Sequence, residues 1–166
     1  SIKKVSIIIL LFICLVLVIF LLREYINYKR FNIENDMSLE VADYLENLQN
    51  DSQLGLEMKE FLNQPADVFY VIGPYLDSQS QQEIIGQPWF FYHDFSDYLF
   101  DEMFFSGTNF RENIQTLVFL KENEIIGIAA VERQIGDFLF LEENDFRVNK
   151  KFRSEEKYNN YYIIRQ

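Results

Sequence analysis

The sequence is short of the residues that most often serve nucleophilic catalysis or metal binding. Its 166 residues include one cysteine, Cys14, and one histidine, His93. Cys14 lies inside an apolar run, so the rest of the chain can form no disulfide and offers no cysteine nucleophile. The sequence also lacks a histidine-rich metal cluster and the spacing of a calcium-binding EF-hand. Thiol chemistry and the common metal sites are therefore excluded outside the apolar run.

Glycine is scarce as well, and its six residues are scattered along the chain. No glycine-rich loop of the kind that binds phosphate groups is present. His93, Asp94 and Ser96 have the residue types of a catalytic triad, but sequence neighbours are seldom arranged as nucleophile, base and orienting acid. Ser96 also lacks the G-x-S-x-G surroundings of a nucleophile elbow. We expect a protein that is not an enzyme and that holds no cofactor or metal ion.

Basic residues are outnumbered by acidic ones. The chain has 15 Lys and Arg against 26 Asp and Glu, a formal net charge of −11. Lys3 and Lys4 are the only charged residues before Arg23, so the chain from Arg23 onward carries −13. Such a field repels nucleic acid and anionic lipid headgroups. It favours a basic protein partner, although an acidic surface also serves plain solubility.

The most pronounced feature that is present is the apolar run over residues 5–22. All 18 of its residues are apolar except Ser6. At about 1.5 Å of rise per residue, a helix of this length spans about 27 Å, close to the hydrocarbon thickness of a bilayer. We predict that residues 1–22 are a short tail and a transmembrane anchor. The predicted span includes Val5, Leu11, Leu17 and Leu22.

Other interpretations of this run fit the residues less well. A cleaved signal peptide has a shorter apolar core and an A-x-A-like cleavage site, which is missing after Leu22. Residues 11–14 loosely suggest a lipoprotein box ending at Cys14, but Phe12 and Ile13 are bulky where small residues belong. A buried core helix that is apolar all round is rare in a domain of this size.

The orientation of the span depends on two opposing signals. Two lysines precede it and Arg23, Lys29 and Arg30 come after it, which slightly favours a cytoplasmic body. The short Lys-Lys tail, in contrast, is typical of segments that keep their own N-terminus inside and export the remainder of the chain. We favour a single-pass membrane protein whose body is periplasmic or extracellular.

Apolar periodicity then predicts one α+β domain over residues 38–166, after a juxtamembrane segment at 23–37. Val41, Tyr44, Leu45 and Leu48 share one face of a helix over Ser38–Asn50. Further helices are predicted at 54–62, at Ser78–Ile85, where Gly86 ends the helix, and after Asp94 as an N-cap.

A mainly antiparallel sheet is expected beneath these short helices. The best hairpin joins 115–121 to 124–133, with Gly127 marking a bulge or a close backbone approach. We predict that Phe119 in this hairpin is buried. The segments predicted as strands are Val68–Ile72, 115–121, 124–133, 138–141, 146–148 and 161–164. The polar segment 150–160 is expected to be exposed.

Several short motifs occur in a characteristic order. They are Tyr-Val-Ile-Gly-Pro-Tyr at 70–75, Ile-Gly-Gln-Pro-Trp at 85–89, Leu-Val-Phe at 117–119, Glu-Arg at 132–133 and Gly-Asp-Phe at 136–138. The series resembles a group of small bacterial membrane-anchored or lipid-anchored proteins without an assigned function. The resemblance covers about residues 67–138, and its motifs are structural rather than catalytic. It implies an exported α+β domain.

Four consecutive aromatic residues at 89–92 stand close to several acidic ones. Aromatic residues often anchor protein interfaces, although they also fill cores. We expect a membrane-tethered protein-binding domain, such as an immunity or inhibitor protein of the cell envelope. The alternative is a structural or assembly subunit whose span packs into a membrane complex. The candidate partner surface comprises Trp89, Phe91, Tyr92, Asp94, Asp97 and Asp101.

Overall fold

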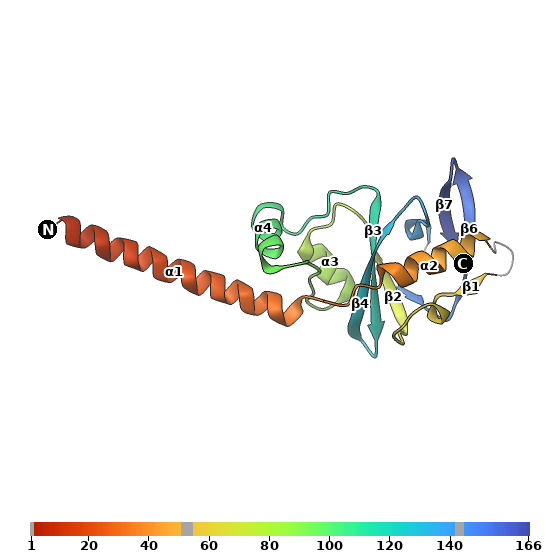
Figure 1. Ribbon diagram of the computed structural model, residues 1–166, viewed down its shortest axis with the longest axis horizontal. Helices are drawn as coiled ribbons and strands as arrows, with labels where there is room; N and C mark the ends of the chain where they lie inside the picture. The colour runs from red at the N-terminus through yellow and green to blue at the C-terminus, as the bar shows by residue number, and fades with distance from the viewer. Residues whose placement is uncertain (1, 51–54, 142–144) are drawn as a thin grey trace.

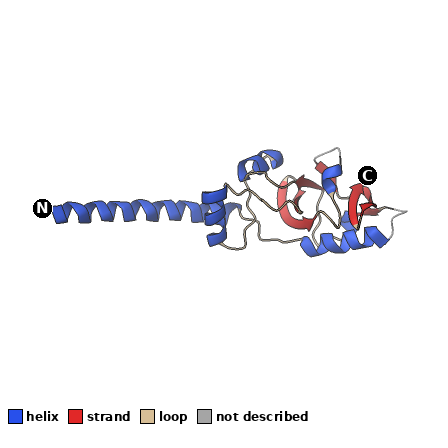
Figure 2. Cartoon of the chain, turned by 90° about the horizontal axis from the view of Figure 1, so that it is seen from above, coloured by secondary structure: helices blue, strands red, loops and turns tan. Residues whose placement is uncertain are grey.

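The computed structural model describes residues 2–50, 55–141 and 145–166. Within these ranges the chain has the α+β architecture that the sequence predicts, with four α-helices and two antiparallel sheets. One long helix projects from a body that contains all the other elements (Figure 1). The same arrangement is seen from above in Figure 2.

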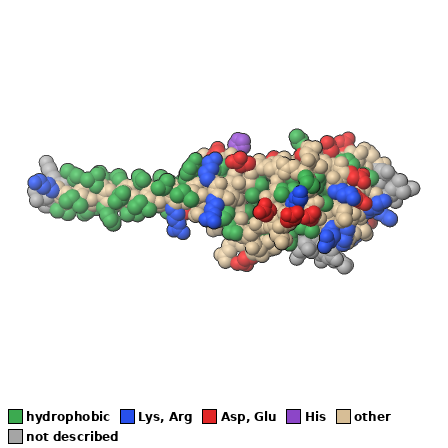
Figure 3. Space-filling model, turned by 90° about the horizontal axis from the view of Figure 1, so that it is seen from below, with side chains coloured by type: hydrophobic (Ala, Val, Ile, Leu, Met, Phe, Trp, Pro, Cys, Tyr) green, Lys and Arg blue, Asp and Glu red, His purple; other side chains and the backbone are tan. Residues whose placement is uncertain are grey.

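Helix α1 (Ile2–Phe31) is continuous through the apolar run and extends into the first part of the juxtamembrane segment. Its large apolar side chains over residues 5–22 are 37–66% exposed, including the predicted span residues Val5, Leu11, Leu17 and Leu22. Figure 3 shows apolar side chains along its visible face. The helix is long and apolar enough to cross a membrane, and Lys29 and Arg30 in its last turn complement the helix dipole.

The central sheet has the strand order β4-β3-β2-β5. Its strands are β2 (Val68–Ile72), β3 (Ile114–Lys121), β4 (Glu124–Glu132) and β5 (Asp145–Arg147). The predicted hairpin is confirmed as β3 and β4, and Phe119 is fully buried. The register shifts beside Gly127, where a Cβ atom would lie 2.4 Å from the Met37 sulfur. Gly127 therefore marks both a bulge and a close approach.

Alternating side chains divide the interior between the two faces of this sheet. Phe69, Leu117 and Phe119 contribute to the larger core. Ile72, Val118 and Leu120, on the same two strands, contribute to the smaller core on the other face. This alternation follows from the two-residue repeat of a strand that is covered on both faces. The predicted strand Val68–Ile72 is confirmed as β2, which lies inside the sheet because it pairs with β3 on one side and β5 on the other.

The larger core is closed by helix α2 and by a second sheet. Helix α2 (Ser38–Asn50) buries Val41, Tyr44, Leu45 and Leu48, the four residues that its periodicity predicts. The second sheet has the order β1-β6-β7, with β1 (Leu56–Glu57), β6 (Lys151–Tyr158) and β7 (Tyr161–Arg165). The predicted C-terminal edge strand is thus confirmed as β7.

Two of the predicted elements are wrong. Segment 54–62 contains β1 and a short 3-10 helix, η1 (Met58–Glu60), rather than an α-helix, and Leu54 lies outside the described residues. Gly55 has a positive φ of 65° and passes close to the backbone of Phe152, which directs the chain into pairing with β6.

The predicted strand at 138–141 is a second 3-10 helix, η2 (Phe138–Phe140). The Asp137 side chain accepts a hydrogen bond from the Leu139 backbone nitrogen at 3.0 Å, which bends the chain into a turn. The fourth strand of the central sheet is instead β5, at the predicted short strand near Phe146. The polar segment 150–160 contains the whole of β6, in which Phe152 is buried and most of the other side chains are exposed.

Asp137 also connects three elements of the body. Its carboxylate accepts hydrogen bonds from the Arg133 guanidinium at 3.0 and 2.7 Å and from the Tyr161 hydroxyl. The side chain of Asp137 has no solvent exposure, whereas that of Arg133 is 26% exposed. This network joins the end of β4, η2 and β7 by charge-assisted hydrogen bonds.

Helices α3 (Ser78–Ile85) and α4 (Phe95–Phe105) lie on the side of the body nearest α1 (Figures 1 and 2). Gly86 ends α3 with a φ of 83°, as predicted, and the Asp77 side chain caps its start by accepting a hydrogen bond from the Ser80 nitrogen. The predicted Asp94 cap of α4 is confirmed by a 3.0 Å hydrogen bond from the Asp97 nitrogen.

Candidate functional site

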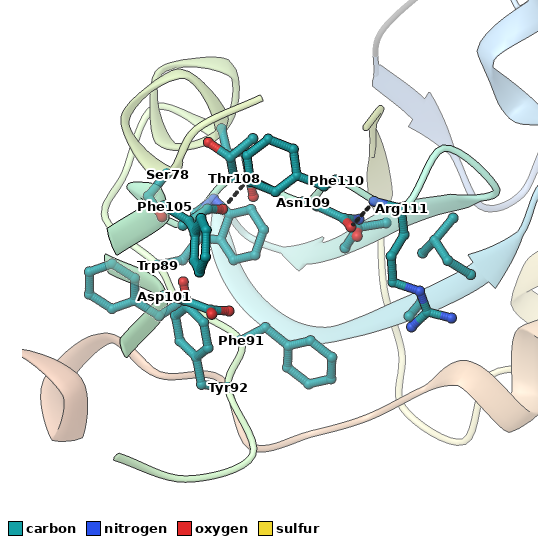
Figure 4. A pocket seen from close by; sticks show the side chains of 16 residues that line it. Ser78, Trp89, Phe91, Tyr92, Asp101, Phe105, Thr108, Asn109, Phe110 and Arg111 are labelled. Atoms are coloured by element: carbon teal, nitrogen blue, oxygen red, sulfur yellow. Dashed lines mark hydrogen bonds between the residues drawn. The ribbon is translucent and has the colours of Figure 1, made fainter. Parts of the chain in front are cut away.

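A pocket of about 480 Å³ opens between α3, α4, the aromatic segment 89–92 and the central hairpin. Figure 4 shows its lining side chains. Four members of the candidate partner surface meet here: Trp89, Phe91, Tyr92 and Asp101. The lining also includes residues that the sequence patterns did not assign to this surface, among them Ser78, Phe105, Phe110 and Arg111.

The remaining two members of the predicted surface lie outside the lining of this pocket. Asp94 is exposed and serves as the cap of α4, where it accepts hydrogen bonds from the Ser96 hydroxyl and the Asp97 nitrogen. Asp97 is exposed on the first turn of α4. These two acidic residues lie at the N-terminal end of α4, the helix that forms one wall of the pocket.

A hydrogen-bonded network holds this end of the pocket together. The Glu102 carboxylate accepts from the Ser78 hydroxyl at 2.5 Å and from the Tyr92 hydroxyl at 2.8 Å. Burial and the negative charge of Glu102 raise the pKa of the Tyr92 hydroxyl, which therefore stays protonated and remains a donor. The network ties α3 and segment 89–92 to α4.

Gly107 makes this network sterically possible. Its φ is 64°, and a Cβ atom on it would lie 1.9 Å from the Ser78 hydroxyl oxygen and 2.5 Å from a Glu102 oxygen. Any side chain here would displace the network and would also be strained by the backbone conformation. The packing of the turn after α4 against Ser78 depends on the tertiary fold and has no local sequence signal.

Asp101 supplies negative charge to the pocket, whose lining also includes the basic residue Arg111. Partial burial, followed by repulsion from Asp97, raises the pKa of the Asp101 carboxyl group. Among the described residues, no ion pair joins Asp101 to a lysine or arginine. The arrangement favours the arrival of a cation, which would relieve the repulsion.

Trp89 adds an unused donor. Its side chain is only 5% exposed, and its indole nitrogen has no hydrogen-bond partner within the described part of the chain. A buried indole N–H usually has an acceptor. The Trp89 side chain lines the pocket, but its indole nitrogen itself is buried from solvent.

Beside the pocket, α4 and the turn after it expose a group of phenylalanine rings. Phe100, Phe104, Phe105 and Phe110 are 43–66% exposed. The Phe100 ring lies 5.0 Å from that of Phe104 and 5.6 Å from that of Phe105, which in turn lies 5.8 Å from that of Phe110. We call these four residues the α4 aromatic cluster. Phe105 and Phe110 belong to both the cluster and the pocket lining, so the two features form one continuous surface.

The only histidine lies at a second hollow of about 400 Å³, near the end of α1. His93 is exposed, and the Ser96 hydroxyl donates to Asp94 at 2.6 Å rather than to the imidazole. The residue types of a triad are therefore present without its order of hydrogen bonds. Across the described residues, no three His, Cys, Asp or Glu side chains gather as metal ligands.

Comparison of the chain with protein-family models, with curated proteins and with solved structures finds no match.

Proposed function

We propose that the chain is a membrane-tethered, non-enzymatic protein-binding module whose binding site is the aromatic pocket. In this proposal α1 crosses the bilayer once and the body lies outside the cytoplasm. The observation that carries the proposal is the pocket itself, which combines aromatic walls with an acidic side chain, Asp101, that forms no ion pair among the described residues. Apolar pockets with a few placed polar groups are typical of binding sites.

The chemistry of the lining indicates what a partner presents. An apolar or aromatic side chain fits between Phe105, Phe110 and Phe91, where burying rings contributes most of the affinity. A neighbouring lysine or arginine of the partner pairs with Asp101. The charge of −13 beyond the anchor accelerates association with a basic partner.

An immunity or inhibitor protein fits this description. Such a protein has to be where an incoming toxic protein meets the envelope, and a single anchor keeps it there. The alternative, a structural subunit of a membrane complex, would place the main protein contact on α1 instead. The two functions therefore differ in which part of the chain touches the partner.

Site-specific photocrosslinking of the full chain in native membranes distinguishes them. A benzophenone amino acid replaces Phe110 at the pocket, Leu17 in the span, or Tyr158 as a control. Tyr158 is a suitable control because its 58% exposure matches the 60% of Phe110 and it lies on β6, away from the pocket. We expect a discrete crosslinked protein from position 110 and none from position 158.

Two further measurements make the result specific. Asp101→Asn should reduce the crosslink at position 110 several-fold, and so should high salt, because both remove the charge attraction. Equal products at 110 and 158 would overturn the proposed site. A discrete product from position 17 alone would favour the structural-subunit function. Turnover of a substrate that His93→Ala abolishes would contradict a non-enzymatic function.

A further inference from the structure

From the placement of α4 against α1, we infer that the exposed face of α4 lies on the lipid bilayer as a second membrane contact. This face consists of Phe100, Met103 and Phe104, which are 55%, 56% and 66% exposed. The inference rests on the proposed function only in requiring that α1 crosses the membrane. The occupant of the face is a zwitterionic lipid surface.

The depth of α4 relative to the bilayer is set by its contacts with α1. The Tyr98 hydroxyl donates to Glu24 on α1 at 2.8 Å, and Tyr25 and Tyr28 pack their rings against Phe95 or Tyr98. Glu24 lies two positions beyond the last residue of the apolar run, which is about 3 Å along the helix axis. Since the headgroup layer on each side is about 5–8 Å thick, α4 is held within it.

The exposed apolar surface of α1 extends beyond the predicted span to the part of α1 that contacts α4. Tyr25 and Ile26 are 44% and 56% exposed, so the apolar surface of α1 continues past residue 22 to the level of α4. Figures 1 and 2 show α4 as the element of the body that lies furthest toward the N-terminal end of α1. A bilayer that covers the apolar run therefore also reaches this side of α4.

The pattern along α4 suits an interfacial helix. Its exposed positions run from Ser96 and Asp97 at the start to Phe100, Met103 and Phe104 in the second half, while Tyr98 is buried. An interfacial helix has this division, with an apolar face that enters the boundary between headgroups and acyl chains. A water-soluble partner would have to displace headgroups to reach the same face.

The charged residues on α4 indicate which class of lipid headgroup this face contacts. The apolar face itself carries no basic residue, and the acidic residues Asp97 and Asp101 lie close to it on α4. Anionic lipid surfaces attract polybasic segments and repel acidic ones. The contact is therefore apolar insertion into a zwitterionic surface, without recognition of an anionic headgroup.

Spin-label accessibility tests this in the full chain, reconstituted as one copy per phosphatidylcholine nanodisc. The native Cys14 is labelled first and reports the depth of α1. Cys14→Ser combined with Phe104→Cys then reports α4, and Met103→Cys repeats the measurement in the same background. Cys14→Ser with Tyr158→Cys is the aqueous control, because Tyr158 has a comparable exposure of 58%.

We expect the ratio of oxygen to nickel-chelate collisions to be several-fold higher at positions 14, 103 and 104 than at 158. A lipid signal at 14 with an aqueous signal at 103 and 104 would overturn the second contact and leave the anchor intact. An aqueous signal at 14 would overturn both. Shielding of 103 and 104 from oxygen and nickel alike would mean that protein covers the face, which also overturns the inference.

Discussion

Two groups of phenylalanine rings in this protein have similar geometry and opposite surroundings. In the larger core, Phe69 lies 5.3–5.9 Å from the rings of Phe119, Phe138, Phe146 and Phe152, and all five are at most 1% exposed. In the α4 aromatic cluster the rings are just as close, but they are 43–66% exposed. Ring contact therefore does not by itself show that a cluster stabilises the fold.

The difference lies in how much surface each group removes from water. A fully buried ring contributes in proportion to its buried apolar area, at about 25 cal/mol per Å². A half-exposed ring gives only part of that contribution, and its remaining surface is available to a lipid or a partner. The core group accounts for folding, whereas the α4 group leaves apolar surface exposed on the side of the body nearest α1.

The same division holds for two carboxylates. Asp137, in the part of the body away from α1, is fully buried and accepts from the Arg133 guanidinium and the Tyr161 hydroxyl. Glu102, beside the anchor, accepts from two hydroxyl groups and is only partly buried. Substitutions of the buried and of the more exposed residues test how strongly burial determines their contribution to stability.

The largest effect is expected from Phe119→Ala in the core. Removing a fully buried ring loses its transfer free energy and leaves a cavity, so the free energy of unfolding should fall by about 3–5 kcal/mol. Urea titration of the full chain in mild detergent, followed by circular dichroism of the body, measures this change. A loss below about 1 kcal/mol would mean that the core does not depend on this ring.

The next largest effect is expected from Asp137→Asn. This change leaves the Arg133 guanidinium facing a neutral amide, and breaking such a pair should cost about 2–4 kcal/mol of unfolding free energy, less than for a fully buried cation. Glu102→Gln is the matched control and should cost about 1 kcal/mol, because only neutral hydroxyl donors are affected. Equal losses would remove the contrast between the two carboxylates.

A smaller effect is expected from raising the pH through the titration of Tyr161. Burial, the hydrogen bond to Asp137 and the negative charge of Asp137 raise the pKa of Tyr161 from 10.0 to about 12. The folded state therefore favours the neutral phenol. This stabilisation is complete below pH 10 and is lost as the pH rises through about 12.

The expected contribution of Tyr161 is about 1–2 kcal/mol, discounted for its partial exposure. Other buried tyrosines titrate in the same direction, so the measured quantity is the difference between the native chain and Tyr161→Phe. Unfolding free energies in urea at several pH values should fall more steeply in the native chain. Parallel curves would show that the Tyr161 phenol does not contribute to the pH dependence.

Most of the elements were predictable because apolar periodicity encodes them directly. Helix α2 follows from the spacing of its four buried residues, and the β3–β4 hairpin from two apolar runs around a polar turn. Strand β6 could not be predicted in this way, since Phe152 is its only fully buried residue and pairing with β1 and β7 holds the rest.

Segment 54–62 was misleading because its apolar spacing also fits a helix. The positive φ of Gly55 and the pairing of β1 with β6 are long-range facts that local spacing does not contain. The pocket, too, was predictable only where local sequence encodes it. Its aromatic wall at 89–92 could be predicted from local density, but the hydrogen bonds that Glu102 accepts from Ser78 and Tyr92 join three segments that only the fold brings together.

The smallest effect on the free energy of unfolding is expected from removing rings of the α4 aromatic cluster. The double substitution Phe100→Ser, Phe104→Ser removes two rings of the α4 aromatic cluster, at 55% and 66% exposure. Each change should alter the unfolding free energy in detergent by no more than about 0.5 kcal/mol, as for other exposed positions. Serine and phenylalanine also have similar helix propensities, so α4 itself is preserved.

The paired measurement is Phe119→Ala in the same detergent, which places both groups on one scale. A ratio of several-fold between the core and cluster effects follows from burial alone, because both involve phenylalanine rings packed against other rings. A loss of more than about 2 kcal/mol from the double substitution would instead make the α4 aromatic cluster part of the folding core. It would also remove the reason for assigning that face to the membrane, since its rings would then already be satisfied within the protein.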